Sequence, residues 1–143
     1  EQNHAAAQRN MGILYYYGRG VQQNYREAGK WLLKAADQND AVAQRNVGLL
    51  YHYGQGVEQD QQKAMAWLIK SADQSDAGAQ YHIGTFYYNG QGVEQNYAQA
   101  MEWFQKAAMQ NHIDAQILSY RCRCILKTFA AEKVNDLMNE TSN

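Results

Sequence analysis

Residues 43–72 read AQRNVGLLYHYGQGVEQDQQKAMAWLIKSA, and the same arrangement of residue types is found one period earlier and one period later. The period is 36 residues, the separation of Gly12, Gly48 and Gly84. Tryptophans follow the same spacing, at Trp31, Trp67 and Trp103. A fixed period in the mid-thirties is typical of stacked helical units that bury their apolar faces against each other. The sequence therefore predicts an all-α fold, an α/α superhelical solenoid of helix-turn-helix repeats.

Each unit contains the signals of two helices joined by a glycine loop. In the second unit, Val47, Leu50 and Tyr51 have helical spacing, Gly54 is placed to end that helix, and Asp60 is placed to cap the next one. We expect helices over about residues 5–17, 25–38, 41–53, 61–74, 77–89, 97–110, 113–126 and 129–139. The tryptophans face small alanines in the same frames, so we assign them to the core.

The repeats fill most of the chain and are expected to form one solenoid domain over residues 1–143. Its parts are repeats at about 4–39, 40–75 and 76–111, followed by a partial repeat and C-terminal capping helices at 112–143. Gln2-Asn3-His4 matches Gln110-Asn111-His112, three periods later. We therefore expect the chain to be a piece of a longer array, with a mature secreted start as the alternative.

Composition argues against several classes of partner. Of the 143 residues, 45% are hydrophobic and 19% are charged, and the formal net charge is −1. This balance gives no field that would attract nucleic acid or an anionic membrane. The sequence has no apolar run long enough to span a bilayer. We therefore expect neither nucleic-acid binding nor membrane insertion.

The sequence offers little support for catalysis or a cofactor. The Gly-x-Gly loops lack the third glycine and the preceding strand of a dinucleotide-binding motif, and they recur in three units. No nucleophile elbow, His-Glu-x-x-His helix or isolated carboxylate pair is present. We expect no enzyme activity and no cofactor.

His112, Cys122 and Cys124 are the nearest group of metal-ligand types. A Cys-x-Cys pair on a helix directs its two thiols to opposite sides, so the pair cannot share a metal there. We therefore expect no metal site. Basic neighbours could lower the pKa of one of these thiols. They are Arg121, Arg123 and Lys127.

The order of residues in each unit resembles the Sel1-like repeat, a relative of the tetratricopeptide repeat. It begins with Ala-x-Ala-Gln and an apolar residue before Gly48, continues with Tyr51 and Gly-x-Gly-Val, and ends with Ala64, Trp67 and a Lys-(Ala/Ser)-Ala triplet. The resemblance covers about residues 4–120. It implies an adaptor that binds proteins or peptides in signalling or in contact between bacteria and hosts. It also slightly favours an exported bacterial protein.

The resemblance further implies that the first helix of each unit lines a concave binding face. The positions carried over from tetratricopeptide repeats are Arg9, Ile13, Tyr16, Tyr17, Arg45, Leu49, His52, Tyr53, Tyr81, Thr85, Tyr88 and Asn89. Their helical spacing forms one stripe, and aromatic and arginine side chains suit binding hot spots. Three alternatives stay open: a solvated face without a partner, a structural module that caps a longer array, and a site for a small ligand such as a cell-wall fragment.

Overall fold

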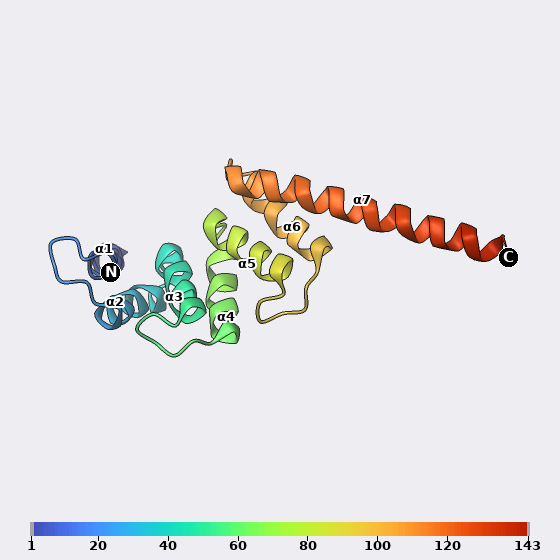
Figure 1. The fold of residues 1–143 in the computed structure, drawn as a ribbon. Coiled ribbons are helices and arrows are strands. Elements are labelled where there is room, and N and C mark those ends of the chain that lie inside the picture. The colour runs from blue at the N-terminus through green and yellow to red at the C-terminus, as the bar shows by residue number, and fades with distance from the viewer. Residues whose placement is uncertain (1, 143) are drawn as a thin grey trace.

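The structure is a computed structural model that describes residues 2–142, and this part of the chain forms seven α-helices and no strand (Figure 1). The helices are α1 (Gln2–Tyr17), α2 (Tyr25–Asp37), α3 (Ala41–Tyr53), α4 (Gln61–Ala72), α5 (Ala77–Asn89), α6 (Tyr97–Ala108) and α7 (Ile113–Thr141). Each helix packs against the next one in the chain. The pairs α1–α2, α3–α4 and α5–α6 lie side by side in a curved row, and α7 leaves the end of the row as a long single rod (Figure 1). The predicted all-α solenoid is confirmed.

The core is a series of small clusters, each shared between neighbouring units. In the first cluster, Leu32 of α2 packs with Val47 and Leu50 of α3. In the second, Leu68 of α4 packs with Phe86 and other apolar residues of α5. Burying a side chain of this size contributes about 1.5–3 kcal/mol. Because each cluster draws on two units, no unit buries its apolar face alone.

The glycines in the first helices allow the two helices of a unit to approach closely. A Cβ atom on Gly48 would lie 2.9 Å from Cγ of Leu68 and 3.0 Å from the carbonyl oxygen of Ala64, both in α4. Gly84 is in the same relation to the ring of Phe104 in α6. These glycines therefore face a partner helix so closely that a side chain there would meet it.

The loops between the two helices of a unit also follow the predicted chemistry. Gly54 ends α3 with φ of +65°, in the left-handed region that favours glycine. The side chain of Asp60 accepts a hydrogen bond from the backbone N–H of Lys63 at the start of α4. Asn24 caps α2 in the same way, but its own N–H donates to the carbonyl of Tyr15. A reciprocal capping box is therefore not formed at this helix.

Glutamines tie each helix pair together at the end opposite these loops. Gln44 is buried in α3 and accepts a hydrogen bond from Nε2 of Gln74, which follows α4, at 2.8 Å. Gln80 and Gln110 repeat the contact one unit later at 2.9 Å. The recurrent Ala-Gln pair therefore has a structural cause, because a buried amide requires a hydrogen-bonding partner.

The tryptophans are less buried than the sequence predicts. Trp31, Trp67 and Trp103 are half-buried, and the fully buried side chain is the neighbouring residue, such as Leu32 or Leu68. One ring face is instead covered by a lysine three residues later, as Lys70 covers Trp67 with Nζ 4.4 Å from the ring centroid. The tryptophans therefore lie at the edge of the core.

The C-terminal segment differs most from the prediction. Two helices are expected over 113–126 and 129–139, whereas α7 is continuous to Thr141. Glycine ends α3 and α5 at Gly54 and Gly90, but the corresponding position of the fourth frame is Leu126. Without the left-handed residue the helix does not stop. Every residue from 127 to 142 is exposed, so this segment does not fold back over the array as a capping helix.

Candidate peptide-binding groove

The two arginines of the predicted stripe hold adjacent units together. Nη1 of Arg9 lies 2.7 Å from Oδ2 of Asp40, and Nη1 of Arg45 lies 2.8 Å from Oδ1 of Asp76. Each aspartate is also the N-cap of the next first helix, accepting a hydrogen bond from the backbone N–H three residues later. These arginines are therefore engaged by the scaffold, and sequence reasoning missed the capping aspartates that engage them.

The third junction uses different chemistry at the same positions. Tyr81 replaces the arginine and His112 replaces the capping aspartate. Their rings stack, with centroids 4.6 Å apart and planes 19° from parallel. The imidazole also accepts the capping hydrogen bond from Ala115 N–H through Nδ1. Tyr81 is therefore also a junction residue.

Three other stripe residues, Tyr16, His52 and Tyr88, make contacts within their own unit or with the following unit. The hydroxyl of Tyr16 donates to Oε1 of Gln55 in the following unit at 2.8 Å. Burial raises the pKa of Tyr16, and the bond to Gln55 partly opposes that effect. His52 lies 2.8 Å from Oε1 of Gln61. Tyr88 packs edge-on against the ring of Tyr97.

The remaining stripe residues leave side chains available to a partner. Tyr17 and Tyr53 are each 58% exposed and hold the same position in successive units, and Asn89 takes that position in the third. Arg19 lies over the ring of Tyr17, 4.9 Å from its centroid. The other members are half-buried: Ile13, Leu49 and Thr85.

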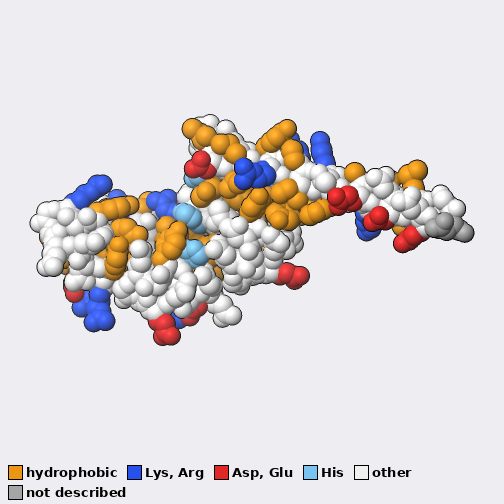
Figure 2. Space-filling model, in the orientation of Figure 1, with side chains coloured by type: hydrophobic (Ala, Val, Ile, Leu, Met, Phe, Trp, Pro, Cys, Tyr) orange, Lys and Arg blue, Asp and Glu red, His pale blue; other side chains and the backbone are white. Residues whose placement is uncertain are grey.

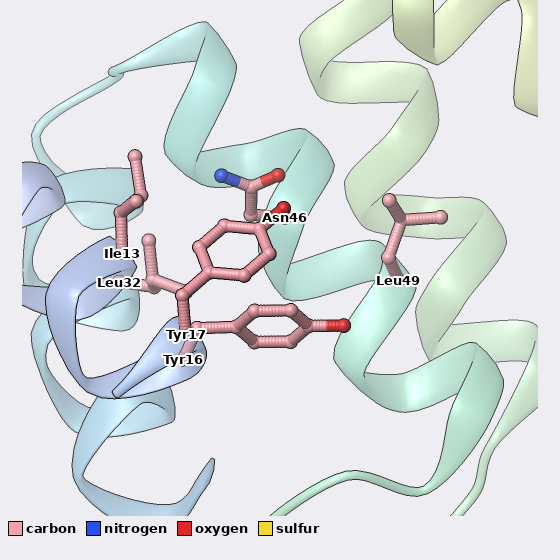
Figure 3. A pocket seen from close by; sticks show the side chains of 6 residues that line it. All are labelled: Ile13, Tyr16, Tyr17, Leu32, Asn46 and Leu49. Carbon is pink, nitrogen blue, oxygen red and sulfur yellow. The ribbon is translucent and has the colours of Figure 1, made fainter. Parts of the chain in front are cut away.

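A small pocket opens between α1 and α3 beside these residues (Figure 3). Its volume is about 80 Å³, and its lining consists of Ile13, Tyr16, Tyr17, Leu32, Asn46 and Leu49. Figure 3 shows the two tyrosine rings extending from α1 towards Asn46 and Leu49 of α3. Pockets that enclose drug-sized ligands have volumes of about 300–1,000 Å³. This one is therefore suited to a single side chain.

Two pocket residues are absent from the sequence prediction. Asn46 is one helical turn before Leu49, so helical spacing alone could have added it. Leu32 reaches the pocket from α2, and no feature of the first helix indicates this contribution. Wider depressions of about 410 Å³ lie elsewhere, one beside Trp67 and Lys70 and one beside Tyr51.

A half-buried histidine, His82 of α5, lies near the second junction. Burial is the main cause that lowers the pKa of His82 to about 4, and the nearby charge of Arg45 lowers it further. His52 and His112 also lower this pKa, whereas Asp76 raises it. His82 is therefore neutral at physiological pH. Figure 2 shows histidine side chains among the apolar ones on this face of the row.

The pKa of the Cys122 thiol is not lowered, as its basic neighbours suggested it could be. Cys122 is buried in α7, and burial raises the pKa of its thiol more than Arg121 lowers it. Cys124 is exposed on the same helix. Within residues 2–142, no group of three or more His, Cys, Asp and Glu side chains is placed to hold a metal ion. None of the helices in this range is both long and apolar enough to cross a bilayer.

Comparison with protein families gives three matches along the chain. The model of the Sel1 repeat matches residues 5–40, 41–76 and 77–112. These matches begin one residue after each predicted unit and cover most of the chain. A comparison with curated proteins gave no match.

Solved structures with the same kind of fold include three bacterial proteins. A Sel1 repeat protein from Oxalobacter formigenes is 39% identical with a TM-score of 0.76, and the match covers 79% of this chain and 46% of that one. The protective antigen c5321 of uropathogenic Escherichia coli, which displays an SLR fold, is 36% identical with a TM-score of 0.76, over 80% of this chain and 24% of that one. Helicobacter pylori cysteine rich protein B is 27% identical with a TM-score of 0.65, over 80% and 87%. The chain thus spans less than half the length of the first two.

Proposed function

The chain belongs to the Sel1 repeat family, and we propose that it is an adaptor that binds a peptide segment of a partner protein. The members of this family are in general non-enzymatic modules for protein interaction. The segment lies across α1, α3 and α5 and inserts one apolar side chain into the pocket between α1 and α3. The observation that carries the proposal is the pair Tyr17 and Tyr53. Both side chains are exposed and repeat in register, Tyr17 lines the pocket, and Tyr53 follows the lining residue Leu49 by one helical turn.

The contacts within the stripe divide it into scaffold and binding positions. Arg9, Arg45 and Tyr81 are occupied by junction contacts, so a partner gains little from them. Tyrosine side chains that stay exposed on a rigid helix offer a large contact area at low entropic cost. The binding positions are therefore Ile13, Tyr17, Leu49, Tyr53, Thr85 and Asn89.

The binding positions also constrain the chemistry of the partner segment. In the first two units they are aliphatic and aromatic, whereas Thr85 and Asn89 in the third unit are polar. A complementary segment has an apolar anchor over α1 and α3 and polar residues over α5. Among the binding positions, the pocket of about 80 Å³ admits one side chain, which suits the anchor of a peptide better than a sugar–peptide ligand.

The test is peptide selection from a random library with the whole chain as bait, followed by titration of the selected peptides. The double variant Tyr17→Ala and Tyr53→Ala should weaken binding at least tenfold without lowering the melting temperature, because both rings are largely exposed. Met109→Ala is the control, since Met109 is 85% exposed and lies after α6, away from the groove. Equal binding by the double variant would leave the chain as a structural module of its array.

Charge reversal of Arg9 and Arg45 is a poor test of the same idea. It would place like charges against Asp40 and Asp76 and so disturb the junctions between units. A loss of binding in that variant would not separate a damaged scaffold from a damaged groove. The exposed tyrosines avoid this ambiguity.

A further inference from the structure

An arginine in the first glycine loop lies beside the proposed groove. Arg19 follows α1, between Gly18 and Gly20, which both adopt the left-handed conformation with φ of +65° and +75°. The backbone N–H of Arg19 donates a hydrogen bond to the carbonyl oxygen of Leu14 at 3.0 Å. The loop is therefore tied to the last turn of α1, which ends at Tyr17.

The side chain of Arg19 stacks on a tyrosine of the groove and keeps its hydrogen-bond donors. Its Cζ lies 4.9 Å from the centroid of the Tyr17 ring. Stacking uses the flat face of a guanidinium, whereas its five N–H donors lie along the edge. The described side chains form three ion pairs, and Arg19 takes part in none of them. The next acidic residue along the chain, Glu27, is bound to Lys30 at 3.0 Å.

The corresponding residue of the second unit shows that this loop position borders the groove. Gln55 takes the place of Arg19 there, and its Oε1 accepts a hydrogen bond from the hydroxyl of Tyr16 at 2.8 Å. Tyr16 lines the pocket between α1 and α3. The third unit also has a glutamine, Gln91, at this position. Only the first unit therefore places a charge at this edge of the groove.

The other charges along the stripe are neutralised or lie at the far end. Arg9 and Arg45 are each bound to the capping aspartate of the next unit. Burial raises the pKa of Tyr81, and the nearby charge of Asp114 in the first turn of α7 raises it further. Arg19 and Asp114 lie at opposite ends of the row of first helices. A carboxylate that enters the groove is therefore attracted to the end formed by α1.

The charges of whole units have the same polarity. Residues 4–39 contain five basic and two acidic residues, residues 40–75 contain three and four, and residues 76–111 contain one and three. Positive charge is thus concentrated in the first unit, which also carries the two tyrosines of the pocket. Complementary charge of this kind guides the approach and the orientation of a partner more than it adds affinity.

We propose that the partner segment carries an aspartate or glutamate within about two residues of its apolar anchor, and that the edge of the Arg19 guanidinium binds that carboxylate beside Tyr17. This inference rests on the proposed peptide groove and specifies the class of segment that the groove takes. Two residues of an extended segment span about 7 Å, which is enough to lead from the pocket past the ring of Tyr17. The acidic residue fixes which end of the segment lies over the first unit.

Peptide selection with the whole chain as bait tests this proposal. A random library should yield sequences with Asp or Glu close to a large apolar residue. The strongest selected peptide is then synthesised with both termini blocked, once with the acidic residue and once with the matching amide. In low salt the amide form should bind about two- to fivefold more weakly, as expected for an exposed ion pair. The difference should diminish as salt rises from about 0.05 to 0.5 M, because exposed charges are screened.

Two substitutions of Arg19 and one control assign the preference to this side chain. Arg19→Gln installs the residue of the two following units and should bind the acidic and amide peptides equally. Arg19→Glu should favour a peptide with lysine in place of the acidic residue. Lys34→Gln is the control, because Lys34 belongs to the same unit and stacks on Trp31 with Nζ 4.8 Å from the ring centroid. It should keep the preference of the wild type. Arg19 and Lys34 are exposed, so the melting temperatures should not change.

The outcomes separate this inference from the proposed groove. If Arg19→Gln keeps the preference for the acidic peptide while Tyr17→Ala with Tyr53→Ala loses binding, the groove stands and the role of Arg19 is wrong. The same holds if the wild type binds both peptides equally. Loss of the preference in Lys34→Gln would assign it to the net charge of the unit. Binding only by peptides with a free C-terminal carboxylate would place a chain end at Arg19, and a library without any binder would refute the groove itself.

Discussion

Replacing Gly48 by alanine tests the close helix approach on which the stack depends. In an exposed helix this change stabilises by about 1 kcal/mol, because glycine is a poor helix former. Here the new Cβ would lie 3.0 Å from the carbonyl oxygen of Ala64 and 2.9 Å from Cγ of Leu68. The leucine side chain can turn away, but the carbonyl belongs to the backbone of α4. The two helices must therefore separate, and overpacking of this kind costs about 1–3 kcal/mol.

Gly29→Ala provides the matched control. Gly29 is also a buried glycine inside a helix, but its added Cβ would lie 3.6 Å from Cδ1 of Leu50, an ordinary van der Waals contact. Both substitutions gain the same intrinsic helix propensity, which cancels when the two variants are compared. The Gly48 variant should therefore be less stable than the Gly29 variant by about 1–3 kcal/mol.

Urea unfolding followed by tryptophan fluorescence and far-ultraviolet circular dichroism measures this difference. Gly29→Ala should raise the urea concentration at the unfolding midpoint above that of the wild type. The midpoint of Gly48→Ala should lie below that of Gly29→Ala. If Gly48→Ala is as stable as Gly29→Ala, the helices do not approach at Gly48 as described, and the packing argument fails for every unit.

Two further substitutions test the junctions between units. Arg45→Met should lower the free energy of unfolding by about 1–3 kcal/mol, because it removes a half-buried charged hydrogen bond to Asp76. A double-mutant cycle with Asp76→Asn, measured by urea unfolding, should show a coupling energy above about 0.5 kcal/mol. Additive losses would contradict the contact. His82→Asn installs the residue that the two preceding units carry at this position. The free energy of unfolding of the wild type should fall by up to about 3 kcal/mol as pH falls from 6.5 towards 4. His82 takes up a proton near pH 6.5 in the unfolded chain but only near pH 4 in the folded one. Thermal melts across this range should show a smaller loss in the variant, and identical pH profiles would refute the assignment.

Much of the fold could be predicted because each unit repeats the same local signals. Gly54 ends one helix, Asp60 begins the next, and Gly48 sets the distance between them. These signals act within about 20 residues and agree with the apolar periodicity, so local and global preferences coincide. The helices of the first three units accordingly begin and end within a few residues of the predicted positions.

The helical spacing of the stripe residues could be read from the sequence, but the contacts of each member could not. Arginine on an exposed helix suits a binding hot spot and an ion pair equally well. The partner that decides between them, Asp40 for Arg9, is 31 residues away and belongs to the next unit. One signal was present in the sequence: Arg45 and Asp76 change together to Tyr81 and His112 at the next junction. Residues that change together at two positions are expected to be in contact. The paired change at these positions therefore indicates that the arginines contact the neighbouring unit.

The last helix, α7, runs straight on because the fourth frame lacks two glycines with different tasks. Leu126 stands where Gly54 and Gly90 adopt the left-handed conformation, so α7 has no residue that stops it. Tyr120 stands where Gly48 admits a second helix, so a chain that did turn back would meet a ring in place of a gap. Either change alone would be opposed by the other signals of the repeat. Together they make the straight helix consistent with its surroundings, and the face that a second helix covers in the preceding units stays exposed on α7.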